Sequence, residues 1–142
     1  MKTEQKELVR STFAQIQPIA EQAAALFYNR LFVLAPEVKP LFKYNMDEQG
    51  RKLMQMIAIA VAHLDRIEEL IPSVQALGKR HTHYGVHAAH YASVGTALLW
   101  TLEQGLGSGW TPEAAASWKE VYGLLSSIMR NAQQAARAKA AA

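Results

Sequence analysis

The chain has 142 residues, no cysteine and a formal net charge of +3, and these values exclude several classes of protein. Without cysteine there is no disulfide framework, no thiolate metal site and no cysteine nucleophile. The charge comes from scattered lysines and arginines, with no basic stripe between aromatic side chains, so we expect no nucleic-acid partner. The N-terminus has no apolar signal core, and the longest apolar run, residues 57–62, is far shorter than a membrane span of about 20 residues. We therefore expect one soluble, cytoplasmic domain over residues 1–142, with no membrane contact.

Helical periodicity runs through the chain, without internal repeats and without sustained β-type alternation. The fold class is therefore predicted to be all-α. Thr3 and Thr111 are expected to cap the first and last helices. The alanine-rich tail, residues 132–142, is expected to extend the last helix but to fray. The predicted helices cover residues 3–19, 18–34, 47–64, 72–85, 91–106 and 111 onward, with a short, stiff proline corner at residues 36–42.

One histidine of the fourth predicted helix, His81, falls on an apolar face. Val74, Leu77 and Gly78 precede it at helical spacing, whereas His83 lies about 200° round the helix and is expected to face away. A haem proximal ligand requires such an imidazole, with an unprotonated nitrogen beside a flat apolar slot. A core histidine fits the same pattern, and the spacing alone favours that plainer interpretation.

The sequence disfavours two other kinds of functional site, a serine hydrolase site and a zinc site. A serine hydrolase is disfavoured because no Gly-x-Ser-x-Gly elbow occurs. A zinc cluster of four histidines including His81 is disfavoured, because helical phase separates the first two and the last two follow a glycine stop near Gly85. Apart from His81, the histidines are interpreted as solvated or capping side chains, and two methionines as packing: His63, His83, His87, His90, Met54 and Met56.

Several spacings in the first half of the chain together resemble a globin, the fold that packs about seven helices around a haem b pocket. Pro36 and Phe42 resemble the globin corner whose phenylalanine stacks on the porphyrin. Tyr28, fourteen residues before Phe42, then falls at the distal position of the second helix. Gln49 and Leu53 match the two distal positions of the helix that roofs the haem.

The second half of the chain carries the same resemblance. Residues 79–86, which contain His81, are similar to the proximal segment of bacterial haemoglobins. Residues 90–95 are similar to a run shared by flavohaemoglobins and single-domain bacterial haemoglobins. The resemblance covers essentially the whole chain and is closest to the Hell's Gate globin type, a single-domain haemoglobin related to flavohaemoglobin haem domains.

The resemblance implies haem b as the cofactor, with His81 as the proximal iron ligand. Lys52 or Arg80 would pair with the haem propionates, although a solvated lysine or arginine needs no such partner. The residues implied to contact the cofactor are His81, Phe42, Leu53, Val86, Lys52, Arg80 and Tyr91.

On the distal side, the resemblance implies that Tyr28 and Gln49 donate hydrogen bonds to bound dioxygen, which acquires partial negative charge. The alternatives are a core tyrosine bonded to a backbone carbonyl for Tyr28 and a solvent-facing helix residue for Gln49. Each such donor contributes about 1 to 3 kcal/mol where the acceptor is charged and the site is dry. Reversible, high-affinity oxygen binding with slow release is therefore expected, and nitric oxide, carbon monoxide and other small haem ligands would use the same position.

On the proximal side, flavohaemoglobins carry a tyrosine and a glutamate around the haem-ligating histidine, and Tyr91 matches the tyrosine. The glutamate falls on Gln133. A neutral amide cannot polarise an imidazole as a carboxylate does. This departure favours oxygen binding over oxygen activation.

The main rival function is nitric oxide dioxygenase, which uses the same pocket. Its turnover requires re-reduction of the haem, and 142 residues leave no room for appended flavin and nicotinamide domains. A separate reductase would therefore be a required partner. A gas sensor is less favoured, because it would need an output domain or a partner protein.

Overall fold

The computed structural model describes residues 1–42, 45–83 and 88–141, and every regular element in these ranges is helical. The prediction of an all-α chain is therefore confirmed. Within these ranges the structure has six α-helices, which is close to the predicted number of about seven. They are α1 (Thr3–Ile16), α2 (Ala20–Leu34), α3 (Met46–Ala62), α4 (Ile71–His83), α5 (Ala88–Leu106) and α6 (Pro112–Ala141). Short 3-10 helices connect them: η1 (Gln17–Ile19), η2 (Pro36–Leu41), η3 (Leu64–Leu70) and η4 (Gly107–Gly109).

The helix starts and ends have local causes, and several of them differ from the predicted ones: α1 ends at Ile16, α2 begins at Ala20, α3 ends at Ala62 and α5 begins at Ala88. The first helix is shorter than predicted, because Pro18 lacks the N–H that would continue the α-helical bonding and lies in η1. The predicted Thr3 cap is wrong, since Lys2 occupies the N-cap and Thr3 is the first helical residue. The cap at Thr111 is confirmed by its hydroxyl oxygen, which accepts a hydrogen bond of 3.1 Å from the amide of Ala114.

At the C-terminal end, α6 continues through the alanine-rich tail to Ala141. The fraying of that tail stays a prediction. The expected helix stop at Gly85 lies outside the described residues, and α4 is described as far as His83.

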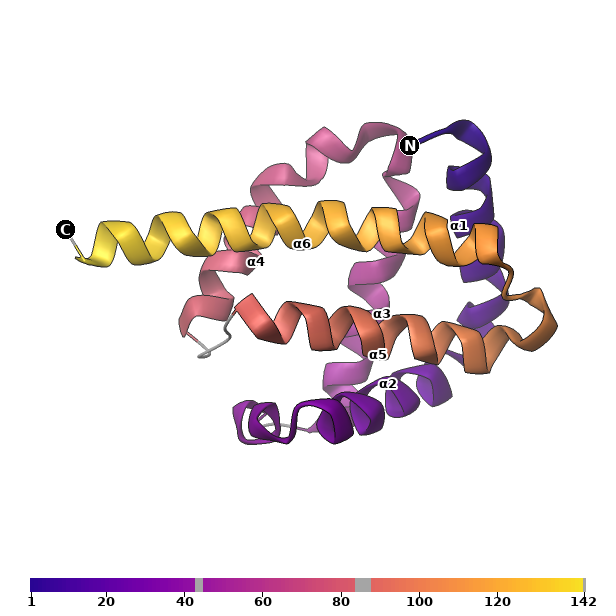
Figure 1. Ribbon diagram of the computed structural model, residues 1–142, viewed down its shortest axis with the longest axis horizontal. Helices are drawn as coiled ribbons and strands as arrows, with labels where there is room; N and C mark the ends of the chain where they lie inside the picture. The colour runs from indigo at the N-terminus through magenta and orange to yellow at the C-terminus, as the bar shows by residue number, and fades with distance from the viewer. Residues whose placement is uncertain (43–44, 84–87, 142) are drawn as a thin grey trace.

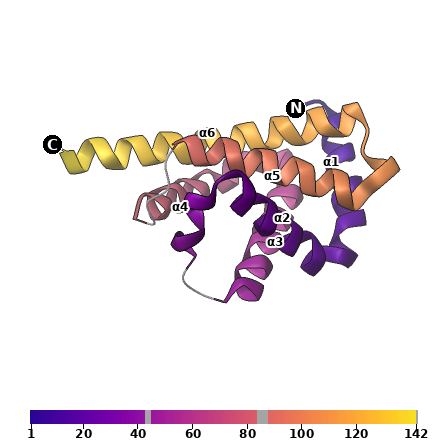
Figure 2. The same cartoon turned by 60° about the horizontal axis from the view of Figure 1, so that its bottom comes forward.

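The helices pack in crossing pairs. Figure 1 shows α5 and α6 running antiparallel, with α3 passing behind them and α1 closing one end. α2 packs on both α3 and α5, whereas α4 packs on α6. In Figures 1 and 2 the C-terminal end of α6 extends beyond the other helices. In the part of the chain that the structure describes, no helix is long and apolar enough to cross a lipid bilayer.

Two clusters of buried apolar side chains hold these helices together. The first lies between α1, α3, α5 and α6 and centres on residues such as Val9, Phe13, Leu102 and Trp118. The second joins α2, the η2 corner and α5, and we call it the Tyr28 cluster. Its buried members are Phe27, Tyr28, Leu31, Ala35, Val38 and Ala97, and Phe32, Leu41, Phe42, Met46, Leu53, Val94 and Leu98 pack against them.

Candidate functional site

Three residues predicted for the distal side, Tyr28, Phe42 and Leu53, lie together in the Tyr28 cluster. The rings of Tyr28 and Phe42 meet edge to face, with centroids 5.2 Å apart and an interplanar angle of 70°, an arrangement that aromatic pairs prefer. Phe32 lies beside both rings, at 6.1 Å from Tyr28 and 5.5 Å from Phe42. Side chains from α2, from the end of the proline corner and from α3 therefore converge on one apolar patch.

The start of α3 positions Gln49 beside this patch. The side-chain oxygen of Asn45 caps the helix by accepting hydrogen bonds from the amides of Asp47 at 2.8 Å and Glu48 at 3.3 Å. These two acidic residues also lie near the positive end of the helix dipole, which favours the helix start. Gly50 lets α3 approach α2 closely, since a Cβ at this position would lie 2.9 Å from the Cβ of Ala24.

Tyr28 is the polar group of the cluster. Its side chain is 9% exposed, and its hydroxyl donates a hydrogen bond of 3.4 Å to the backbone carbonyl of Gln49. Hydrogen bonds between hydroxyl and oxygen are usually about 2.7 to 2.8 Å long, so this contact is weak. Burial raises the pKa of Tyr28 to about 12, because the charged phenolate is disfavoured away from water. The hydroxyl therefore remains a hydrogen-bond donor at neutral pH.

Gln49 itself is half-buried. Its backbone carbonyl is the acceptor for Tyr28, and among the described residues its side-chain amide has no hydrogen-bond partner. The Tyr28 hydroxyl and the backbone of Gln49 thus lie on neighbouring helices beside the apolar patch.

The structure describes only some of the predicted proximal residues. His81 lies in the last turn of α4, but its side chain and all of Val86 lie outside the described residues. Gly78, one turn earlier, is buried against α6, where a Cβ would lie 2.5 Å from the carbonyl oxygen of Met129. The sequence interpretation associated this small residue with the histidine, whereas the structure shows that it allows α4 to pack closely on α6. Arg80 is exposed, with no ion pair among the described residues.

Tyr91 and Gln133 are both buried, with side chains 6% and 2% exposed. The backbone carbonyl of Tyr91 accepts a hydrogen bond from the hydroxyl of Tyr122, which ties α5 to α6. The pKa of Tyr122 is raised, chiefly by burial. Tyr91 and Gln133 therefore occupy interior positions of α5 and α6.

Lys52 lies on the surface of α3. Its side chain is 66% exposed, and its ammonium nitrogen lies 3.8 Å from a carboxylate oxygen of Glu48. An exposed pair of this kind holds the side chain only weakly, so Lys52 is free to interact with another anion.

The α3 face that carries Gln49 and Leu53 also carries Met56, three residues after Leu53 and therefore on the same side of the helix. Met56 is 42% exposed, which differs from its interpretation as a packing residue. Its neighbour Met54 does pack against the core. Leu53 and Met56 therefore form a short apolar stripe along α3.

Two features of the site were missed or misread in the sequence. Val94 and Leu98 of α5 line the Tyr28 cluster. Their helical spacing was visible, but the sequence did not show that α5 packs on α2. His90 was interpreted as solvated or capping, yet it is buried, and its Nε2 lies 3.7 Å from Glu37 of the proline corner. His63 does cap α3, with its backbone amide bonded to the carbonyls of Ile59 and Ala60.

The zinc alternative depended on four histidines, of which only His90 has a described side chain. Among the described residues, no group of three or more histidine, aspartate and glutamate side chains is placed to hold a metal ion. The structure therefore adds nothing in favour of a zinc site.

The amino-acid sequence of the chain matches a known protein family. The globin family model matches residues 25–129. The chain is 32% identical over 142 residues to a flavohemoprotein of Bordetella parapertussis and 31% identical over 124 residues to that of Bacillus subtilis. These alignments cover 97% and 84% of this chain but 35% and 31% of the relatives, so the chain spans about a third of their length.

A solved bacterial globin from Campylobacter jejuni has the same fold, with a TM-score of 0.80. The match covers 94% of this chain and 96% of that chain at 24% identity. The chain belongs to the globin family.

Proposed function

We propose that the chain binds haem b through His81 and holds dioxygen reversibly and with high affinity beside Tyr28 and Gln49. Membership of the globin family supports haem-based gas binding in general. Haem would supply an iron centre that binds a diatomic gas, with the neutral imidazole of His81 as the protein ligand. Every other contribution comes from side chains of this chain.

The observation that carries the proposal is the environment of Tyr28. Its hydroxyl is buried next to Phe42 and donates a long hydrogen bond, of 3.4 Å, to the carbonyl of Gln49. Turning that hydroxyl toward a partly charged oxygen atom would exchange a weak bond for a stronger one, worth about 1 to 3 kcal/mol. The raised pKa of Tyr28 keeps the proton available for this bond.

The remaining residues would hold and orient the cofactor. Phe42 and Leu53 would pack on one side of the ring, and Val86 and Tyr91 on the side of His81. The exposed cations Lys52 and Arg80 would pair with the propionates, which lie at the solvent edge of a haem. The amide of Gln49 would act as the second donor to the gas.

The test of this proposal is the absorption spectrum of the purified protein when oxidised, reduced and exposed to carbon monoxide. Haem bands that shift on reduction and on carbon monoxide binding are expected, and His81→Ala should remove the carbon monoxide-sensitive five-coordinate spectrum. Absence of haem bands, or bands unchanged in His81→Ala, would rule out the assignment.

A second candidate is nitric oxide dioxygenase working with a separate reductase. The identity of about a third with flavohemoproteins supports it, whereas the neutral Gln133 counts against strong oxygen activation. Nitric oxide consumption should be followed with oxygen, the protein and a reductase present. One stoichiometric burst supports oxygen binding as the function, and sustained turnover supports the dioxygenase.

A further inference from the structure

The charged residues of the chain are unevenly distributed along the sequence. Residues 70–102 and 121–142 contain five lysines and arginines and no aspartate or glutamate, whereas the rest of the chain contains the other ten basic residues and all twelve acidic ones. These two stretches therefore carry a formal charge of +5, and the remainder carries −2. The first stretch includes the whole of α4, and the second includes the last two-thirds of α6.

The fold brings basic residues of both stretches together where α4 packs on α6, which Figures 1 and 2 show side by side. Gly78 of α4 lies against α6, where a Cβ would be 2.5 Å from the carbonyl oxygen of Met129. Lys79 directly follows Gly78, and Arg130 directly follows Met129. The side chains of Lys79 and Arg130 are exposed, as is that of Arg80. We call Lys79, Arg80 and Arg130 the basic cluster.

No carboxylate neutralises the basic cluster in the part of the chain that the structure describes. α4 contains no acidic residue. The guanidinium of Arg130 donates hydrogen bonds only to neutral groups, at 3.4 Å to the carbonyl of Ser126 and at 3.3 Å to the hydroxyl of Ser127. Exposed charges without a partner of opposite sign attract an anionic molecule from solution, and salt weakens that attraction. The basic cluster therefore fits a negatively charged surface.

Two kinds of anionic partner fit the basic cluster poorly. A helix that binds a lipid surface buries an exposed apolar face in it, but among the described residues of α4 no large apolar side chain is exposed. A nucleic acid is an extended polyanion, so it would also meet the rest of the chain, whose formal charge is −2. A compact acidic protein can instead contact the basic cluster alone.

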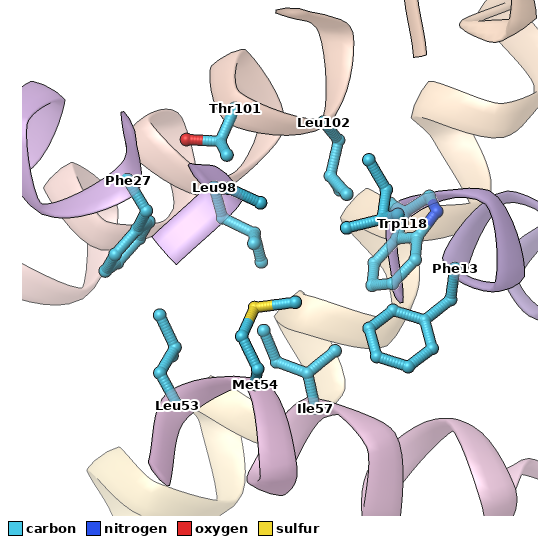
Figure 3. Close-up of a pocket in the computed structure, with 11 residues that line it drawn as sticks. Phe13, Phe27, Leu53, Met54, Ile57, Leu98, Thr101, Leu102 and Trp118 are labelled. Carbon is cyan, nitrogen blue, oxygen red and sulfur yellow. The ribbon is translucent and has the colours of Figure 1, made fainter. Parts of the chain in front are cut away.

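The position of the basic cluster on α4 relates it to the proposed function, because α4 also carries His81, the proposed iron ligand. The interior between α3 and α5 is closed to an electron carrier. Figure 3 shows Leu53, Met54 and Leu98 pointing toward one another there, and the space between these helices is about 10 Å³, no more than one water molecule needs. A donor that binds at the surface of α4 needs no route through this interior.

We propose that the basic cluster docks an acidic one-electron donor protein, which reduces the ferric haem iron to the ferrous state that binds dioxygen. The donor loses one electron and the iron gains it, and no covalent bond forms or breaks. This inference rests on the proposed function, because only a haem bound through His81 gives the electron a destination. Electron-transfer complexes are small, transient and steered by charge, which suits a cluster of exposed cations.

The test is the rate at which a reduced flavodoxin, an acidic protein that carries flavin, reduces the ferric holoprotein in a stopped-flow instrument. At low ionic strength Lys79→Glu and Arg130→Glu should each slow this reduction several-fold, and added salt should slow it in the unaltered protein. Lys119→Glu, the same reversal at an exposed position near the start of α6, should leave the rate unaltered. Arg80 is kept in every variant, because the proposed function assigns it to a propionate.

The intrinsic reducibility of the iron is checked with photoreduced deazariboflavin, a neutral reductant that should reduce all variants at one rate. Unchanged flavodoxin rates in both Lys79→Glu and Arg130→Glu, or an equal slowing in Lys119→Glu, would overturn the proposal. Tighter binding of the basic cluster to anionic phosphatidylglycerol vesicles or to duplex DNA than to flavodoxin would overturn it as well.

A second measurement does not depend on the iron. When oxidised flavodoxin is titrated into the isotope-labelled protein at low salt, the backbone amide NMR signals of Lys79 and Arg130 should shift, and that of Lys119 should not. Unshifted signals at Lys79 and Arg130 would overturn the proposal even if the protein binds haem and carbon monoxide. Absence of haem bands would instead overturn the proposed function, and the amide shifts would still decide whether the basic cluster docks an acidic protein.

Discussion

The hydroxyl of Tyr28 donates a hydrogen bond of 3.4 Å to the backbone carbonyl of Gln49 and thereby joins the middle of α2 to the first turn of α3. The acceptor is a main-chain atom, so substitution of the Gln49 side chain leaves it in place. The two proposed donors can therefore be removed one at a time. Because this hydrogen bond is long, its loss alone should lower the free energy of unfolding only slightly.

Tyr28→Phe should raise the dissociation rate of dioxygen at least several-fold. The substitution removes only the hydroxyl and keeps the edge-to-face contact with Phe42, and a hydrogen bond to a charged acceptor contributes about 1 to 3 kcal/mol. The rate is measured by mixing the oxygenated protein rapidly with carbon monoxide. Tyr122→Phe, the same change at a hydroxyl bonded to the backbone of Tyr91, serves as the control. An unchanged rate in Tyr28→Phe would remove Tyr28 from the distal role.

The phenols of Tyr28 and Tyr122 should also ionise late. Burial raises the pKa of Tyr28 from 10.0 to about 12 and raises that of Tyr122 as well. An alkaline titration followed by the ultraviolet absorbance of phenolate should show a late phase that diminishes in Tyr28→Phe and in Tyr122→Phe. Because the unfolded chain ionises first, the stability present below pH 10 should fall above it, by about 1.4 kcal/mol per pH unit for each buried tyrosine. A titration complete near pH 10 would contradict the buried setting of both phenols.

The helical fold was predictable because its signals are local. The cap at Thr111, the proline corner and the spacing of apolar residues each act within a few residues of the chain. The start of the first helix was predicted one residue too late. Thr3 is a good cap residue by type, but Lys2 occupies the N-cap and Thr3 is the first helical residue. Pro18 was compatible with either of two overlapping helices, and the structure places it in a 3-10 turn between them.

The site was predictable only in part, because tertiary contacts decide it. The association of Tyr28, Phe42 and Leu53 could be expected from the globin resemblance, and no periodicity indicates it. The burial of His90 against Glu37 depends on where α5 meets the proline corner, which no local pattern records. Helical spacing places Gly78 one turn before His81, but it does not show that the missing Cβ of Gly78 makes room for the backbone of Met129.

The close contact between Gly78 and the backbone of Met129 predicts that an alanine substitution at Gly78 lowers the stability of the protein. Gly78→Ala should destabilise the protein by about 1 to 3 kcal/mol, because the new Cβ would lie 2.5 Å from a backbone oxygen that cannot move without shifting α6. Gly123→Ala should instead stabilise it by about 0.5 to 1 kcal/mol, since Gly123 lies inside α6 with nothing within 4 Å and alanine favours the helix. Urea unfolding measures both. Equal stability of the two variants would show that α4 and α6 do not approach as closely as the structure places them.

Gln133 lies where the flavohaemoglobin resemblance expects a glutamate. If Gln133 faces the His81 imidazole, Gln133→Glu should make that imidazole a stronger electron donor, because a carboxylate accepts the imidazole N–H more strongly than an amide does. The iron–histidine stretching frequency of the reduced protein should then rise. Burial of the new carboxyl raises its pKa, so the rise should disappear as the pH falls through that value. Gln134→Glu, an identical change at the exposed neighbour, should leave the frequency unaltered. A frequency that responds equally to both substitutions, or to neither, would mean that Gln133 does not face His81, and the preference for oxygen binding over activation would lose its proximal argument.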